Sequence, residues 1–448
     1  MLRSELLILL EENLPGSWFV ILGDQRTLKF RRFAALGCRR ARAAGEHRPR
    51  RTDERNTMKI PIAIGALSLA TLAEQASAQW TYTNLMPRGA QESVGYDAGG
   101  GQQAGYVYVD GVVRASLWIG TPGSWIDLNP ADSTASQAFA ASGGQQGGSA
   151  VVSGIERASL WSGTSASWVD LHPAGAAQSR VMGIGGAGQQ VGHVRPSAQQ
   201  PPRASLWNGT AASRVELHPA GSTMSIAYST NGRNQAGFAV VDGSYRASLW
   251  SGTAASWVDL NPAGSTDSVV SDIDGDQQVG YAWVGWQRAS LWSGTAASWV
   301  DLSPPGVFGS SQARGARDGL QVGYVFFDDK YRASLWSGTA DSWVDLSAFL
   351  PADYMQSEAW SISSDGVNRY ITGFGVRGQG ADQVVEAWLL TQPILAPCAV
   401  ADLDCDGSVN AVDLATLLGA WGGSGPGDLD GDGSVGAPDL AILLGAWG

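Results

Sequence analysis

A short repeated phrase limits the folds that are open to this chain. Its first half, Arg-Ala-Ser-Leu-Trp, occurs six times, and its arginines stand at positions 114, 157, 203, 246, 288 and 332. The copies are therefore 43, 46, 43, 42 and 44 residues apart. A second half of the type Ser-Trp-Val-Asp-Leu follows each copy. A fixed period of this length indicates a repeat architecture, in which neighbouring units bury one another's apolar faces.

A further phrase keeps the same period. The type Gln-Gln-Val-Gly-Tyr has seven copies, which begin at Gln102, Gln145, Gln189, Asn234, Gln277, Leu320 and Tyr370. Each repeat reads as four short strands that are rich in Val, Trp, Tyr and Ser and bounded by Gly, Pro, Asn and Asp. Four antiparallel strands in each such period predict an all-β fold, a seven-bladed β-propeller over residues 79–390. An open β-solenoid is the alternative.

The two ends of the array favour a closed ring. The array begins with a lone copy of the second half-phrase at Trp80–Leu85 and ends with a lone copy of the first at Glu386–Leu390. These strands should pair with each other, which would remove the exposed sheet edges. Within each repeat we also expect the arginine to pair with the aspartate of the second half, as in Arg246 and Asp259.

A processing signal is predicted within the first 78 residues. Met58 and Lys59 precede an apolar run, and Ala76-Ser77-Ala78 forms a small-residue cleavage site, so residues 58–78 are predicted to be a secretory signal peptide. Residues 1–57 are interpreted as a mis-annotated or disordered extension. The signal peptide predicts that the chain is secreted. A membrane span is not expected, because the apolar run is shorter than the roughly 20 residues that a transmembrane helix needs. The net charge of −12 argues against a nucleic-acid partner.

The C-terminal segment, 398–448, follows a predicted linker at 391–397 and contains a duplicated acidic loop. Carboxylates stand at loop positions 1, 3, 5 and 12 and glycine at position 6, a spacing that supplies the oxygen ligands of Ca²⁺. A helix should follow each loop, with Leu414, Leu417, Leu418 and Trp421 on one face of the first. We predict two calcium ions, with Asp402, Asp404, Asp406, Ser408, Asn410 and Asp413 at the first site and Asp428, Asp430, Asp432, Ser434 and Asp439 at the second.

These motifs resemble two known families. The repeats are similar to the HAF-type extracellular repeats of bacteria, although Arg-Ala-Ser replaces the His-Ala-Phe of that name. The duplicated loop-helix unit resembles a dockerin of the GC type, an all-α module. That resemblance implies a cohesin-like or cell-surface protein as partner of 398–448. Loop positions 10 and 11 carry Ala411 and Val412, then Ala437 and Pro438, in place of the hydroxyl pairs of many dockerins.

No catalytic constellation is visible in the sequence, so we expect no enzyme. A residue written into every repeat is usually structural, and features that interrupt the repeat are better candidates for a binding site. These are Trp283, Trp286, Asp328 and Asp329, together with the insert 347–360. Exposed aromatic side chains of this kind could stack on a glycan.

The sequence-based reading is a secreted, non-catalytic propeller for extracellular binding or display. It would attach to a scaffold or cell surface through the calcium module. The alternatives are a carbohydrate-binding or glycoside-hydrolysing component of a polysaccharide-degrading complex, and a purely structural matrix protein.

Overall fold

The structure, a computed structural model, describes residues 80–448 apart from 308, 379–382, 395–399, 405–406 and 426. It also describes one pair of two-residue strands nearer the N-terminus, β1 (Gly23–Asp24) and β2 (Thr27–Leu28). The predicted signal peptide and most of the predicted extension 1–57 lie outside the described residues. In the described part of the chain, no helix is long and apolar enough to cross a membrane.

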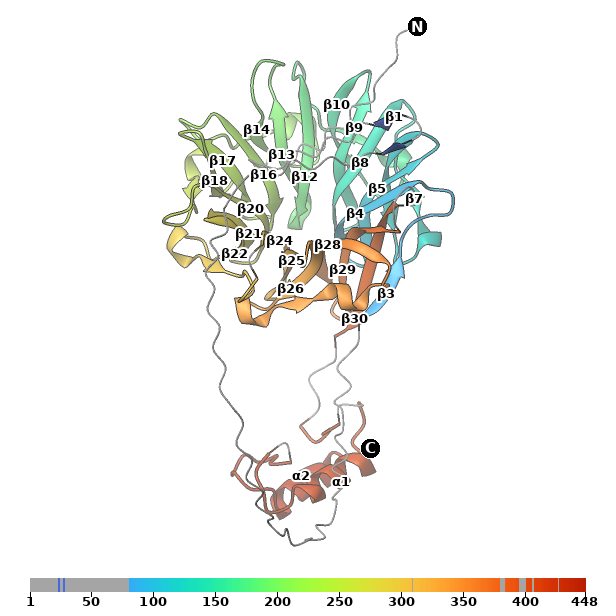
Figure 1. Ribbon diagram of the computed structural model, residues 1–448, viewed down its shortest axis with the longest axis vertical. Helices are drawn as coiled ribbons and strands as arrows, with labels where there is room; N and C mark the ends of the chain where they lie inside the picture. Colours follow the sequence, from blue (N-terminus) through green and yellow to red (C-terminus); the bar gives the residue numbers. More distant parts are fainter. Residues whose placement is uncertain are drawn as a thin grey trace, which may run out of the picture. The chain divides into compact units, whose positions relative to one another are not determined.

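Seven four-stranded antiparallel sheets make up the described residues of the propeller (Figure 1). The first strands are β4 (Glu92–Gly99), β8 (Ser133–Ser142), β12 (Gln178–Gly185), β16 (Met224–Thr230), β20 (Ser268–Asp274), β24 (Ser311–Arg317) and β28 (Tyr354–Ser364). The second strands are β5 (Gln102–Val109), β9 (Gln145–Val152), β13 (Gln189–Arg195), β17 (Gln235–Val241), β21 (Gln277–Val284), β25 (Leu320–Phe327) and β29 (Asn368–Arg377). We number the blades 1 to 7 in the order of their first strands.

The third and fourth strands carry the two halves of the repeated phrase. The third strands are β6 (Val112–Trp118), β10 (Ile155–Trp161), β14 (Arg203–Trp207), β18 (Ser244–Trp250), β22 (Trp286–Trp292), β26 (Lys330–Trp336) and β30 (Val384–Pro393). The fourth strands are β7 (Ile126–Asp127), β11 (Val169–Asp170), β15 (Val215–Glu216), β19 (Val258–Asp259), β23 (Val300–Asp301), β27 (Val344–Asp345) and β3 (Thr81–Asn84). The prediction of seven blades with four strands each is confirmed.

The fourth strands are shorter than the phrase suggests. In blades 1 to 6 a 3₁₀ turn precedes a strand of two residues: η1 (Pro122–Ser124), η2 (Ser165–Ser167), η4 (Ala211–Ser213), η5 (Ala254–Ser256), η6 (Ala296–Ser298) and η7 (Ala340–Ser342). Two more 3₁₀ turns are η3 (Gly186–Gly188) and η8 (Leu346–Phe349). In blades 1, 2, 4, 5 and 6 the tryptophan after the turn lies outside the ladder, and its indole N–H donates to the phrase serine, as from Trp257 to Ser248 at 2.7 Å. In blade 3 Arg214 stands at this position and donates to Ser205 at 3.0 Å.

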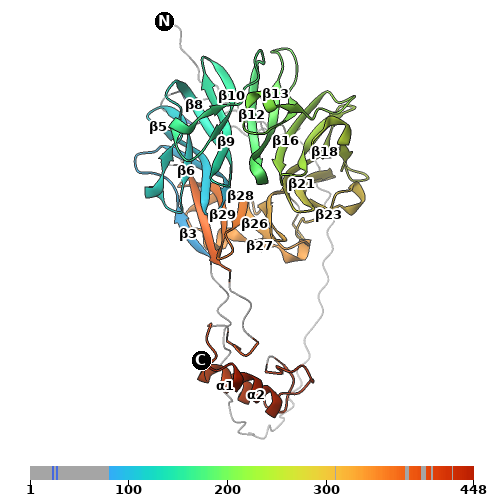
Figure 2. The same ribbon diagram turned by 180° about the vertical axis from the view of Figure 1, so that it is seen from behind.

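The ring is closed by the two ends of the array, as predicted. Strand β3 pairs antiparallel with β30, from Thr81 opposite Thr391 to Asn84 opposite Trp388. Figure 1 labels the blue β3 and the orange β30 side by side, and Figure 2 shows the same region from behind. The first strands of consecutive blades touch one another all the way round, from β4 through β28 and back to β4. The first strands are therefore the innermost ones.

A buried serine on each first strand ties its blade to the preceding one. Its Oγ accepts a hydrogen bond of 2.8–3.0 Å from the backbone N–H of the phrase alanine, a geometry found at all seven blade interfaces. At the closure, Ser93 of blade 1 accepts from Ala387 of blade 7. A buried N–H without an acceptor is costly, so this hydrogen bond stabilises each blade interface.

The tryptophan of the repeated phrase lies in the core, and its arginine forms an ion pair. The phrase tryptophan is fully buried in every blade: Trp118, Trp161, Trp207, Trp250, Trp292, Trp336 and Trp388. The predicted arginine–carboxylate pair is confirmed in blades 1 to 6, at 2.7–3.0 Å in five of them and between Arg288 and Asp301 in blade 5. In blade 7 the carboxylate stands at the arginine position instead, and Glu386 accepts a hydrogen bond from the side chain of Asn84 at 3.0 Å.

Each first strand also contains a β-bulge that the sequence analysis did not predict. The register shifts by one residue at the same place in all seven blades, and a glycine of the second strand lies opposite: Gly105, Gly148, Gly192, Gly237, Gly280, Gly323 and Gly373. A Cβ at any of these glycines would overlap a carbonyl oxygen of the first strand. The glycine of the Gln-Gln-Val-Gly-Tyr phrase is therefore required by close backbone approach.

The C-terminal unit contains two nine-residue helices, α1 (Ala411–Gly419) and α2 (Ala437–Gly445). Its core holds Val409, Leu417, Val435 and Leu443. The single apolar face expected for each helix is split. Leu417 is fully buried, whereas Leu418 is 50% exposed, because adjacent helix positions point about 100° apart. Trp421 lies beyond the end of α1 at Gly419 and is 48% exposed.

Candidate functional site

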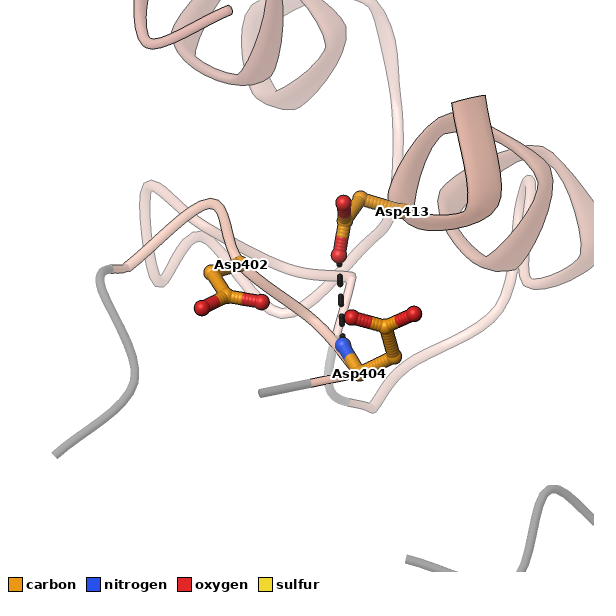
Figure 3. Close-up of side chains that lie close together, drawn as sticks. All are labelled: Asp402, Asp404 and Asp413. Carbon is orange, nitrogen blue, oxygen red and sulfur yellow. Dashed lines mark hydrogen bonds between the residues drawn. The ribbon is translucent and has the colours of Figure 1, made fainter. Parts of the chain in front are cut away.

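The first acidic loop places three of the predicted ligands around one point. Carboxylate oxygens of Asp402, Asp404 and Asp413 lie within 4.8 Å of one another (Figure 3). Asp402 accepts a hydrogen bond from the N–H of Gly407 at 3.0 Å, which folds the loop back on its first residue. Gly407 has a φ of 90°, so the sharp turn at position 6 uses the left-handed conformation that favours glycine.

The second loop repeats this design. Oxygens of Asp428, Asp430 and Asp432 lie within 4.8 Å of one another, and Asp428 accepts from the N–H of Gly433 at 2.9 Å. Gly433 has a φ of 96°. Ser434 donates from its hydroxyl to Asp432 at 2.9 Å, and its backbone N–H also donates to Asp432.

The aspartate at position 12 joins each loop to its helix. Asp413 accepts from the backbone N–H groups of Leu403, Asp404 and Asn410, and Asn410 caps α1 through its side chain. Burial acts to raise the pKa of Asp413, but these N–H groups hold it below its ordinary value. Asp439 has the same role in the first turn of α2, where the N–H of Gly436 is the main cause of a lowered pKa. Both carboxylates are thereby kept ionised.

The donor set fits a hard divalent cation. Ca²⁺ takes about six to eight oxygen ligands, and carboxylates on alternate loop residues, with a backbone carbonyl at position 7, are its usual source. The loops gather carboxylates that repel one another without a cation. Asp406 lies outside the described residues, and Asp439 is not among the three carboxylates gathered in its loop.

The predicted binding residues of the propeller lie at the hairpin turns of two neighbouring blades. Trp283 and Trp286 flank the hairpin turn of blade 5, where the guanidinium of Arg288 lies 4.0 Å from the Trp286 ring centre. Asp328 and Asp329 form the corresponding turn of blade 6 with φ of 54° and 57°. Aspartate tolerates this left-handed backbone, so the turn itself accounts for the pair. The insert 347–360 forms η8 and most of the innermost strand of blade 7.

Comparison with known proteins shows the fold alone. No family model matches the chain, and no curated protein matches it. Among solved structures, it resembles the β-propeller domain of the trilobed protease from Pyrococcus furiosus, at 9% identity and a TM-score of 0.43, over 68% of this chain and 97% of that one. A puromycin hydrolase matches at 12% identity and a TM-score of 0.44, over 67% of this chain and 53% of that one.

These matches correct the expected function. Prolyl endopeptidases also match, at 10% identity and a TM-score of 0.44, over 69% of this chain and 50% of theirs. Propellers with this fold thus occur in peptidases, so inferring a non-catalytic binding or display protein from the fold was wrong. Neither that role nor its polysaccharide-degrading alternative is retained.

Proposed function

We propose that this chain is a calcium-binding protein whose C-terminal unit, residues 400–448, folds around two Ca²⁺ ions. The observation that carries the proposal is the gathering of three carboxylates within 4.8 Å in each of two loops. A cluster of exposed acids would be weak support by itself. Here each loop has a left-handed glycine at position 6 and a position-12 aspartate in the first turn of the following helix.

The dockerin-like resemblance adds a partner to this proposal. The two copies expose the same pair of apolar side chains, Leu418 and Trp421 after the first loop and Leu444 and Trp447 after the second, each about half exposed. Exposed apolar side chains at matched positions are suited to binding a protein surface. A cohesin-like protein is the partner class that we propose for the C-terminal unit. For the propeller, we propose on the basis of its sequence motifs that it belongs with the HAF-type repeats.

Isothermal titration of Ca²⁺ into the full chain tests the metal sites. We expect two sites in the wild type, one in Asp402→Ala, one in Asp428→Ala, and none in the double variant. Asp341→Ala removes an exposed aspartate from a propeller turn and is the matched control. Absence of calcium binding by the wild type would contradict the proposal, as would equal binding by the wild type and the double variant.

The partner is tested separately. The double variant Trp421→Ser with Trp447→Ser should still bind two calcium ions but lose a cohesin-like protein that the calcium-loaded wild type retains on a column. Retention that is unchanged by these substitutions, or by removal of calcium, would contradict this part while leaving the metal sites intact.

A further inference from the structure

The seven bulges place one extra side chain per blade on the innermost strand. These residues are Tyr96, Phe139, Met182, Tyr228, Ser271, Arg314 and Trp360. All seven are partly exposed, although they belong to the strands that touch one another around the centre of the ring. Solvent therefore reaches this layer of side chains, and a bulge is a common device for directing a side chain toward a site.

Five consecutive blades combine into a continuous arc of aromatic and guanidinium groups. The ring of Tyr96 lies 5.2 Å from that of Phe139 and 5.0 Å from that of Trp360. Beyond them, the guanidinium of Arg180 lies 5.1 Å from the Phe139 ring centre, and that of Arg314 lies 3.9 Å from the Trp360 ring centre. We call Arg314, Trp360, Tyr96, Phe139 and Arg180 the axial arc.

Two aromatic rings of the axial arc already bind cationic groups of the protein. The face of an aromatic ring carries negative potential and attracts a cation within about 6 Å of its centre. The faces of Phe139 and Trp360 each receive a guanidinium of the protein itself. These two arginines are in turn balanced by carboxylates, Arg180 by Glu156 at 2.7 Å and Arg314 by Glu358 at 3.4 Å.

Negative charge next to the arc is not balanced in this way. Asp97 directly follows Tyr96 and accepts hydrogen bonds from Ser361 at 2.5 Å and from the N–H of Ala141 at 2.7 Å. Asp272 follows the bulge residue of blade 5 and accepts from Ser229 and from the N–H of Ala316. Among the described residues, neither aspartate forms an ion pair with Arg, Lys or His.

We propose that the axial arc, with Asp97 and Asp272 beside it, binds an organic cation of the alkylammonium or guanidinium class. The ring of Tyr96, which lies between Phe139 and Trp360, supplies the cation–π surface. The two aspartates supply negative charge when they are ionised, which for Asp97 requires a pH above about 7, so the cation should bind more tightly at high pH. The charge of Asp272 adds to the larger effect of burial in raising the pKa of Asp97, so the two carboxylates repel each other when both are ionised. A bound cation would offset that repulsion. The proposal is independent of the calcium sites.

Calorimetric titration of the full chain with two cations and a neutral isostere tests the proposal. Choline represents a free alkylammonium ligand, and N-acetylarginine amide represents a guanidinium side chain of a peptide. The uncharged 3,3-dimethylbutan-1-ol has nearly the shape of choline. At least one cation should bind about tenfold more tightly than the isostere, which corresponds to a cation–π contribution of about 1–2 kcal/mol. The tighter of the two cations identifies the source of the ligand.

Two tyrosine variants locate the site, because both tyrosines occupy the same bulge position. Tyr96→Ala, in the arc, should weaken cation binding about tenfold or more. Tyr228→Ala, on blade 4 outside the arc, should change it less than about threefold, and thermal unfolding shows whether each variant is folded. Equal binding of cation and isostere, no binding of either cation, or equal losses in two folded variants would overturn the proposal.

Discussion

At the residue scale, contacts with the backbone explain why the same residues recur in each repeat, without any role in chemistry on a substrate. The phrase alanine donates its N–H to the serine of the next blade, and the phrase serine accepts the indole N–H of the following tryptophan. The glycine of the second strand lies where the bulge brings a carbonyl oxygen against it. A residue needed by every blade interface recurs in every blade, whatever the protein does.

Gly280→Ala tests the role of the bulge. A Cβ at Gly280 would overlap the carbonyl oxygen of Val269, so the strands must separate, and we expect the free energy of unfolding to fall by about 3 kcal/mol. Urea denaturation measures this loss. Gly123→Ala is the control, because a Cβ there meets nothing within 4 Å. Losses of the same size in both variants would show that the bulge does not constrain the glycine.

The pH dependence of stability should carry a contribution from Asp97. Burial is the main cause that raises its pKa from 3.8 to about 7. Between these values the folded protein keeps a proton that the unfolded chain has released, so this contribution to stability falls as the pH rises from about 4 to about 7.

Urea midpoints across that pH range, in wild type and in Asp97→Asn, isolate the contribution of Asp97. The comparison cancels the contributions of other buried groups, and the variant should lose less stability than the wild type as the pH rises. An identical slope in both proteins would refute the raised pKa. Asp132→Asn, at an exposed turn, should leave the slope unchanged.

At the scale of the strand, closure of the ring depends on the same contacts as every other blade interface. Ser93 accepts from Ala387 at 2.9 Å across the closure, and Ser268 accepts from Ala247 at 3.0 Å between blades 4 and 5. Ser93→Ala and Ser268→Ala should therefore each lower the free energy of unfolding by about 1–3 kcal/mol. A negligible loss for Ser93→Ala beside a clear loss for Ser268→Ala would show that the ring is open at that interface.

Most of this element pattern could be predicted, because it is written identically in each repeat. The period predicts the blades, and the two half-phrases at Trp80 and Glu386 predict the closing pair. The bulges were missed because the extra residues, such as Tyr96, Ser271 and Arg314, share no residue type. The only available signal was the glycine at one position of every copy of the second-strand phrase, which marks close backbone approach.

The candidate sites differ in the same respect. The calcium loops are local in sequence, so spacing alone predicts their carboxylates. The axial arc draws its residues from five blades, and they meet only when the ring closes. Features that interrupt the repeat, such as Trp283 and Asp328, lie at hairpin turns, and the binding role predicted for them stays a prediction.

At the scale of the whole molecule, the propeller and the C-terminal unit are each stabilised by different interactions. The propeller relies on apolar burial and closed hydrogen-bond ladders, with one fully buried tryptophan in each blade. The C-terminal unit has a small core around Leu417 and Leu443 and two crowded acidic loops. A domain of about 50 residues buries little apolar surface, so a metal is a common source of its remaining stability.

Differential scanning calorimetry of the full chain, with calcium and then with excess EDTA, tests the central claim most directly. Two unfolding transitions are expected in calcium. Chelation should abolish the transition of the C-terminal unit, because its carboxylates then repel one another, and should leave the larger transition of the propeller in place. Identical traces with calcium and with EDTA would contradict the assignment of 402–413 and 428–439 as calcium loops.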